Sequence, residues 1–281
     1  MRYQIFGSVM VLALAACSSP EEVKGRMAVE SDDTASATAE KDSETPEKPD
    51  APAESAEAVK FEDNEKDGEA ERDFSYSWPK QVSAIPALAK ILTEQRDKAL
   101  AAQKKDWKES VDEYGPDGCV SCVMRDYQTT WKVVTDTPRF LSISSESYLY
   151  TGGAHGNTGT GGMVWDRKAG ASMDARQMFT SASAFWGAAE AAYCSALNDE
   201  RAERRGRPVQ PDDYGSECPK FEELTLLAGS SNGKTFNRLG LIADPYVAGA
   251  YAEGPYEVTL PVTDAILGAV KAEYREFFSV K

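Results

Sequence analysis

The sequence predicts an α+β fold, an antiparallel sheet packed with helices, preceded by a signal peptide and a disordered acidic tether. Three observations predict this organisation. Residues 6–16 are almost wholly apolar, residues 18–72 contain a single aromatic residue, and strand-like and helix-like periods then mix without a repeating βαβ unit. We therefore divide the chain into a signal peptide at 1–16, a cysteine-headed linker at 17–72 and a folded body at 73–281.

The first seventeen residues combine a charged start, an apolar run and a terminal cysteine. An apolar core of this length, with small residues before the cut, is typical of a secretory signal and too short to span a bilayer. Leu14-Ala15-Ala16-Cys17 resembles a bacterial lipobox, in which the signal is cut before the cysteine and that cysteine carries the lipid. The resemblance implies a lipoprotein anchored to a membrane through palmitate-type acyl chains on Cys17. An ordinary cleaved signal with a chance cysteine is the alternative.

The two residues after the cysteine bear on which membrane holds the lipid. Ser18 and Ser19 follow Cys17, and no aspartate stands there to indicate inner-membrane retention. By resemblance to other lipoproteins, this favours the outer membrane, with the body facing the periplasm.

Charge is concentrated in the linker. Residues 18–72 carry a net charge of −11, whereas residues 73–281 carry −5. So polar a segment cannot bury enough apolar surface to offset its ordering entropy, which predicts a disordered tether. The negative charge argues against a nucleic-acid partner and permits a cationic one.

The body begins with strand and helix patterns that follow one another closely. Residues 75–83 read as a strand, which Pro79 either confines to an edge or ends. Apolar residues at helical spacing predict a helix over residues 86–113. Alternation predicts an antiparallel pair of strands at 123–134 and 140–150, with a third strand at 162–167. Later segments read as helices at 174–179 and 182–203, strands at 236–242 and 256–260, and an amphipathic helix at 263–278.

Four cysteines remain once Cys17 is assigned to the lipid. In a secreted chain disulfides are the default, and four cysteines allow three pairings. We favour Cys119–Cys122 and Cys194–Cys218, because each pair is nearest in sequence. A four-thiolate zinc site and a redox-active Cys-Val-Ser-Cys motif are the alternatives. We expect no metal and no cofactor.

The most distinctive stretch of the body is rich in glycine. It runs Tyr150-Thr151-Gly152-Gly153-Ala154-His155-Gly156. Residues 165–170 and the Pro-Tyr…Gly-Pro-Tyr-x-Val pattern at 245–258 accompany it. Together these segments resemble the DUF4163/DUF3298 region over roughly residues 74–278. That region forms the extracytoplasmic part of the lysozyme-sensing anti-sigma factor RsiV and the non-catalytic part of the peptidoglycan deacetylase PdaC. The resemblance implies a fold and a cell-envelope setting.

Two classes of function follow. The resemblance implies a periplasmic binding module for a lysozyme-like protein or for peptidoglycan. Tyr246, Tyr251 and Tyr256 stand at five-residue intervals in a Gly/Pro-rich segment, where they either pack the core and its corners or serve as ligand contacts. The alternative is a cell-wall hydrolase or a deacetylase-accessory enzyme that uses His155, the only histidine, as a base. No nucleophile-elbow sequence or suggestively spaced acid accompanies His155, so we assign no catalytic residue and favour the module. In the module, His155 is either a turn residue whose imidazole hydrogen-bonds the backbone or part of the contact surface.

Overall fold

The computed structural model describes residues 56–281, so the predicted signal peptide, Cys17 and residues 18–55 of the predicted tether lie outside it. The first three strands are β1 (Val59–Glu62), β2 (Glu65–Asp67) and β3 (Ala70–Trp78). Residues 59–72 therefore belong to the folded body, which corrects the predicted boundary at residue 73. The acidic residues of β1, β2 and the start of β3 give these segments a composition like that of the linker, so composition did not reveal them. Phe61 nevertheless packs edge-on against Phe74, with ring centroids 6.1 Å apart.

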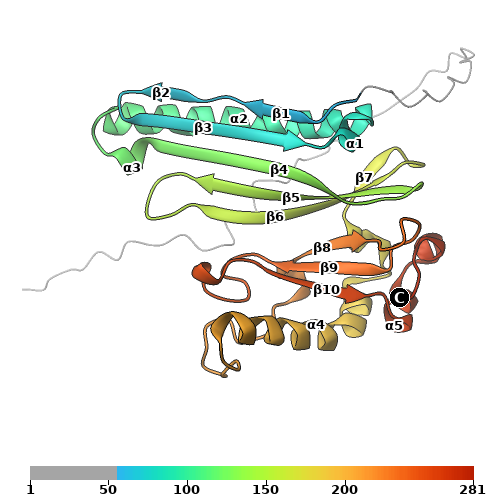
Figure 1. The fold of residues 1–281 in the computed structure, drawn as a ribbon. Helices are drawn as coiled ribbons and strands as arrows, with labels where there is room; N and C mark the ends of the chain where they lie inside the picture. Colours follow the sequence, from blue (N-terminus) through green and yellow to red (C-terminus); the bar gives the residue numbers. More distant parts are fainter. Residues whose placement is uncertain (1–55) are drawn as a thin grey trace, which may run out of the picture. The chain divides into compact units, whose positions relative to one another are not determined.

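The larger sheet has the strand order β1-β3-β4-β5-β6-β7, with β2 also paired to β3 (Figure 1). Its remaining strands are β4 (Met124–Asp136), β5 (Phe140–Tyr150), β6 (Asn157–Asp166) and β7 (Ala171–Met173). Strands β3 and β4 are parallel, because the chain between them crosses over through α1 (Lys80–Ser83), α2 (Pro86–Tyr114) and α3 (Val120–Val123). The other pairs are antiparallel, which confirms the predicted fold class.

Helix α2 covers one face of the larger sheet and confirms the helix predicted over residues 86–113. Pro86 occupies its first turn, where the missing N–H costs nothing, and Leu88 and Leu92 are buried against the sheet. In the same core the Nε1 of Trp131 donates a hydrogen bond to the hydroxyl of Tyr76 at 2.9 Å. Burial raises the pKa of Tyr76 to about 12, so this phenol stays neutral. None of the helices in residues 56–281 is long and apolar enough to cross a membrane.

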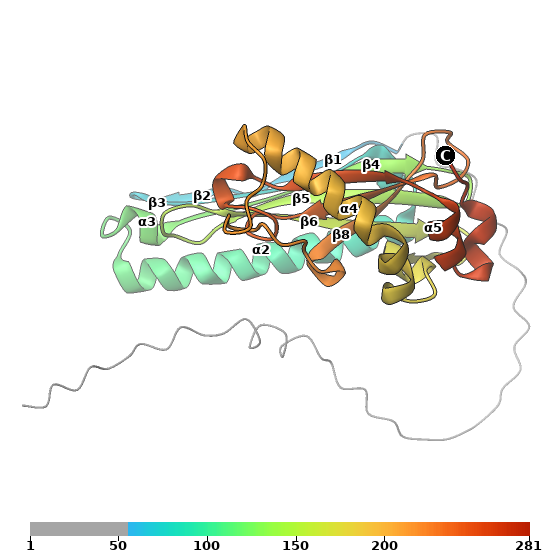
Figure 2. The same ribbon diagram turned by 90° about the horizontal axis from the view of Figure 1, so that it is seen from below.

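The smaller sheet has the strand order β10-β9-β8 and is covered by α4 (Ala182–Arg205), which crosses in front of the strands in Figure 2. Its antiparallel strands are β8 (Leu224–Gly229), β9 (Arg238–Ala243) and β10 (Tyr256–Pro261). Strand β8 lies beside β4, β5 and β6, so the two sheets share a core that includes Phe140 and Val164. Where the sheets meet, a half-open hollow of about 300 Å³ lies between them; its lining includes Tyr148, Asp244 and Glu257.

The C-terminal helix predicted over residues 263–278 is broken. Helix α5 (Asp264–Ala269) ends, and a separate 3₁₀ helix (Ala272–Phe277) follows. Between them Val270 forms an isolated bridge with Phe179, and the Lys271 N–H donates a hydrogen bond to the Met178 carbonyl at 2.9 Å. Main-chain pairing with the segment before α4 therefore takes the place of helical hydrogen bonds. The predicted helix at 174–179 is a short 3₁₀ helix, Ala175–Met178.

Candidate binding surface

The glycine-rich loop joins β5 to β6 and is held by two tyrosines at the end of β5. The Tyr150 hydroxyl donates a hydrogen bond to the Gly153 carbonyl at 2.8 Å. Gly152 and Gly153 have φ angles of 101° and 92°, which L side chains rarely adopt. A Cβ atom at Gly156 would lie 2.4 Å from the Tyr148 ring. The glycines predicted from the motif are thus required by backbone conformation and close packing.

His155 stands in this loop and contacts a second segment, residues 244–255, which we call the tyrosine loop. Its ring stacks on Tyr251 with centroids 4.1 Å apart and planes 22° apart. The Tyr251 hydroxyl donates a hydrogen bond to the Gly156 carbonyl at 2.7 Å, and the His155 Nδ1 lies 2.8 Å from the same carbonyl. The His155 Nε2 lies 3.3 Å from the Tyr246 hydroxyl. The structure therefore brings together His155, Tyr246 and Tyr251, which we call the aromatic cluster.

Tyr246 is held in an unfavourable backbone conformation while its side chain is 49% exposed. Its φ is 73°, and among residues 56–281 it is the one non-glycine residue with a positive φ. Such a conformation in a bulky residue costs on the order of 1–3 kcal/mol and is found chiefly at functional sites. The Tyr246 N–H donates a hydrogen bond to the Gly249 carbonyl at 3.2 Å, which closes the turn.

Tyr256, the third predicted ligand contact, lies in the core instead. It is fully buried, its hydroxyl donates a hydrogen bond to Glu253, and the Arg204 guanidinium stacks 4.1 Å above its ring. Tyr256 opens β10, whose alternation places it with Val258 and Leu260 on the side that faces α4. A ring enclosed in this way cannot contact a ligand.

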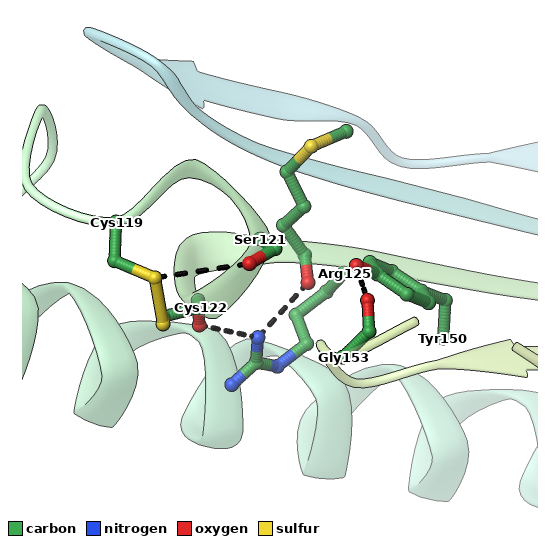
Figure 3. The surroundings of a disulfide bond; sticks show 7 residues. Cys119, Ser121, Cys122, Arg125, Tyr150 and Gly153 are labelled. Atoms are coloured by element: carbon green, nitrogen blue, oxygen red, sulfur yellow. Dashed lines mark hydrogen bonds between the residues drawn. A yellow bond between two sulfur atoms is a disulfide. The ribbon is translucent and has the colours of Figure 1, made fainter. Parts of the chain in front are cut away.

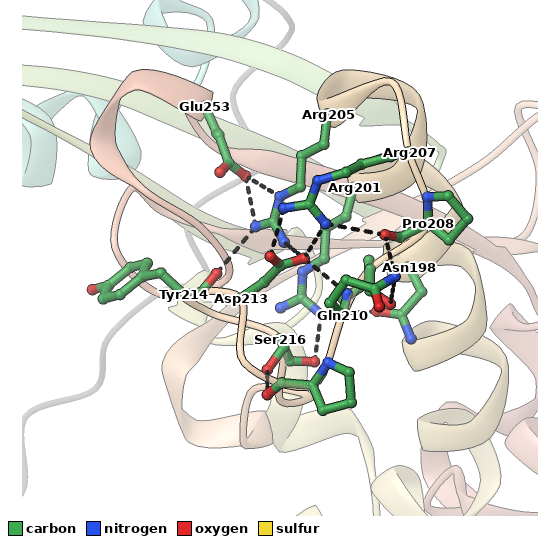
Figure 4. A network of polar contacts seen from close by, with 12 residues as sticks. Asn198, Arg201, Arg205, Arg207, Pro208, Gln210, Asp213, Tyr214, Ser216 and Glu253 are labelled. Carbon is green, nitrogen blue, oxygen red and sulfur yellow. Dashed lines mark hydrogen bonds and ion pairs between the residues drawn. The ribbon is translucent and has the colours of Figure 1, made fainter.

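Arginines at the end of α4 hold the tyrosine loop in place (Figure 4). Arg204 donates hydrogen bonds to the Glu253 and Pro255 carbonyls, both at 2.7 Å. Arg205 forms an ion pair with Glu253 at 2.9 Å. Burial raises the pKa of Glu253, but hydrogen bonds from Arg205 and Tyr256 outweigh it and leave that pKa below its ordinary value. No pattern in the sequence indicated this supporting role.

The disulfide between Cys119 and Cys122 lies close to the glycine-rich loop (Figure 3). A Cβ atom at Gly152 would lie 2.9 Å from the Ser121 carbonyl oxygen, so the loop and the disulfide-closed turn are in close contact. Arg125, which is buried, donates a hydrogen bond to the Cys122 carbonyl at 2.8 Å. The second disulfide joins Cys194 to Cys218. Both pairs are those predicted from the sequence.

The ring of His155 is surrounded by main-chain and aromatic groups. Its two ring nitrogens approach a carbonyl and a phenol, and among residues 56–281 no carboxylate hydrogen-bonds to the ring. A general base needs a nucleophile or a substrate proton within reach, with a group that orients it. Within the same residues no group of three or more His, Cys, Asp or Glu side chains is arranged to hold a metal ion. The cluster is a partly exposed aromatic surface that ring stacking and hydrogen bonds hold together.

Comparison with known proteins agrees with the fold. Residues 65–158, which contain the glycine-rich loop, match the family model described as deacetylase PdaC. A DUF3298 family protein from Pseudomonas aeruginosa PAO1 has a similar structure, with a TM-score of 0.53 and 19% sequence identity over 81% of this chain and 99% of that one. A DUF3298 family member from Bacteroides fragilis matches 77% of this chain and 97% of its own, with a TM-score of 0.44 and 15% identity. No curated protein matches the sequence.

The family-model match and the Pseudomonas structure confirm the predicted resemblance to the DUF3298 region. At 19% identity the Pseudomonas structure shows the fold alone. The chain is thus similar to the PdaC family model over residues 65–158 and to the Pseudomonas DUF3298 protein in its fold.

Proposed function

We propose that this protein is a lipoprotein of the cell envelope whose periplasmic body captures a basic, lysozyme-like protein through the aromatic cluster. The lipobox-like Leu14-Ala15-Ala16-Cys17 supports the anchor, and Ser18 and Ser19 support an outer-membrane location. The match of residues 65–158 to the family model described as deacetylase PdaC supports an envelope setting.

One observation carries the binding role. Tyr246 is held with an exposed ring at a φ of 73°, in contact with the stacked pair His155 and Tyr251. Pre-ordered aromatic side chains lose little entropy on binding, and tyrosine is enriched among residues that dominate binding energy. Strain that is kept in order to display a ring is more readily explained by binding than by folding.

The charge of the body supports a basic ligand. Residues 56–281 contain 35 acidic and 26 basic residues, a net charge of −9, and residues 1–55 add further acids. Opposite charges speed the encounter of two proteins. Salt weakens this effect, because at 0.1 M it screens exposed charges that lie more than about 10 Å apart.

Calorimetric titration of the mature chain, with Cys17→Ser to keep it soluble, tests the proposal. Hen lysozyme is titrated at low and at high salt. We expect micromolar or tighter binding that weakens as salt rises. Absence of binding at both salts would overturn the lysozyme-like ligand, and retention of the same chain by insoluble peptidoglycan would then identify the wall as the ligand. Labelling of cells with a palmitate analogue tests the anchor, because label that persists in Cys17→Ser would contradict it.

A further inference from the structure

A second loop lies beside the tyrosine loop and is tied to it through the backbone. This loop comprises residues 206–220, and we call it the stapled loop because Cys218 bonds to Cys194 in α4. Gly215 has a φ of 63°, and a Cβ atom there would lie 2.8 Å from the Ala248 carbonyl carbon. The two loops therefore approach main chain to main chain, at a distance that only glycine permits.

One buried guanidinium links the two loops. Arg201, which is 1% exposed, donates hydrogen bonds to the Glu217 carbonyl at 2.9 Å and the Ser216 carbonyl at 3.2 Å in the stapled loop. It also donates to the Ala248 carbonyl in the tyrosine loop at 2.8 Å. Hydrogen bonds from a buried charge to three carbonyls fix both loops relative to α4.

Tyr214 is presented to solvent by this arrangement. Its carbonyl accepts a hydrogen bond from the Arg205 Nη2 at 3.1 Å, and its hydroxyl lies 3.4 Å from the Tyr246 carbonyl. Its side chain is nevertheless 60% exposed, more than any other large apolar or aromatic residue in 56–281. The Cys194–Cys218 disulfide, the buried Arg201 and the close contact of Gly215 thus fix the loop that carries Tyr214. The Tyr214 side chain is exposed to solvent and does not contribute to the core.

An open hollow of about 580 Å³ lies between Tyr214 and Tyr246, and its lining is acidic. Three carboxylates, Asp213, Glu217 and Glu223, line it together with one ammonium, that of Lys220. Asp213 is paired with Arg205 and Arg207, whereas Glu217 and Glu223 are exposed. Tyrosine rings and carboxylates together suit a cation. The face of an aromatic ring attracts a cation that lies within about 6 Å of the ring centroid.

We propose that the hollow between Tyr214 and Tyr246 receives a lysine or arginine side chain that protrudes from the protein ligand. The stapled loop is then the second wall of the binding surface, with Tyr214 as its anchor. This inference rests on the proposed function, since it assigns the ligand's basic contact to a particular place beside the aromatic cluster.

The test separates the two claims by using two probes on the mature Cys17→Ser chain, oxidised. Hexa-arginine peptide probes the hollow, with hexa-glutamine as the uncharged control, and hen lysozyme probes the proposed function. We expect hexa-arginine to bind, to bind at least about 10-fold more weakly to Tyr214→Ala, and to bind Tyr214→Phe nearly as well. Tyr114→Ala is the matched control, because Tyr114 is 47% exposed and lies outside the hollow.

Each outcome decides one claim. If hexa-arginine fails to bind, or if Tyr214→Ala and Tyr114→Ala bind it equally, the cation site is overturned. If hexa-arginine binds as expected but lysozyme does not, the hollow stands as a cation site and the lysozyme-like ligand is wrong. If lysozyme binding is weakened by Tyr251→Ala but not by Tyr214→Ala, the aromatic cluster stands and the second wall is overturned. Circular dichroism of Tyr214→Ala identifies any loss of fold.

Discussion

The imidazole of His155 stacks on the ring of Tyr251 at 4.1 Å, and this contact joins the glycine-rich loop of the larger sheet to the tyrosine loop of the smaller one. The Gly156 carbonyl accepts a hydrogen bond from the Tyr251 hydroxyl and also lies beside the His155 Nδ1. One main-chain group therefore contacts both rings of the stack. Two segments distant in sequence thereby form one surface.

Removal of the Tyr251 ring should abolish most of the binding without unfolding the chain. Tyr251 is only half-buried, so Tyr251→Ala leaves the core intact while removing the platform for His155. We expect a loss of about 2 kcal/mol or more of binding free energy, as for an interface hot spot. Calorimetry measures it, and Tyr251→Phe separates the ring from the hydroxyl. An unchanged affinity in Tyr251→Ala would count against the cluster.

Replacement of Tyr246 by glycine should stabilise the fold relative to replacement by alanine. Both variants lose the ring, but only glycine adopts the φ of 73° without strain. We expect the free energy of unfolding of Tyr246→Gly to exceed that of Tyr246→Ala by about 1 kcal/mol, measured by urea denaturation. Both should bind ligand more weakly than the parent. Equal stability of the two variants would show that the conformation is unstrained.

The ion pair of Glu253 should make the tyrosine loop acid-sensitive. The folded pKa of Glu253 lies below its ordinary value of 4.5, so its contribution to stability is present above about pH 4.5 and is lost as pH falls through the folded pKa. In Glu253→Gln this part of the acid dependence should disappear. Urea denaturation from pH 6 to pH 3 measures it, with the exposed Glu257→Gln as control. Parallel pH profiles for Glu253→Gln and the parent would contradict the assignment.

The two disulfides should contribute unequally to stability. Cys194–Cys218 closes a separation of 24 residues, whereas Cys119–Cys122 closes 3. Loop-closure entropy then makes the longer bridge more stabilising by about 1.5 kcal/mol. Denaturation of the paired serine variants, Cys194→Ser with Cys218→Ser and Cys119→Ser with Cys122→Ser, measures the difference. A larger loss from the short bridge would show that its contact with the glycine-rich loop matters more than entropy.

Periodicity predicted the elements whose sequence pattern is undisturbed. Helix α2 repeats its apolar residues at helical spacing, so its buried face could be predicted directly. The antiparallel pairing of β4 with β5 was also predicted, but the first four residues of β5 are all buried, which simple alternation does not indicate. Strands β1 and β2 and the start of β3 were assigned to the linker, because their solvent-facing positions are acidic. Strand β8 was not predicted, because its short apolar run lies next to a charged segment.

Some residues of the candidate binding surface could be predicted from the sequence. The glycines and His155 follow from the motif, and Tyr246 and Tyr251 from their Gly- and Pro-rich context. Alternation in residues 256–260 carried a signal that Tyr256 faces the core, since it shares a face with Val258 and Leu260. The role of Tyr214 depends on a disulfide and a buried arginine that meet only in three dimensions, so no local pattern could indicate it.

Hydrogen exchange of the mature chain with and without hen lysozyme tests the central claim most directly, because it locates the binding surface. We predict that protection on ligand addition concentrates in residues 150–157, 206–220 and 244–255, with no change along α2. Protection confined to α2 or to the hollow between the two sheets, or no protection anywhere, would contradict the assignment of the aromatic cluster as the binding surface.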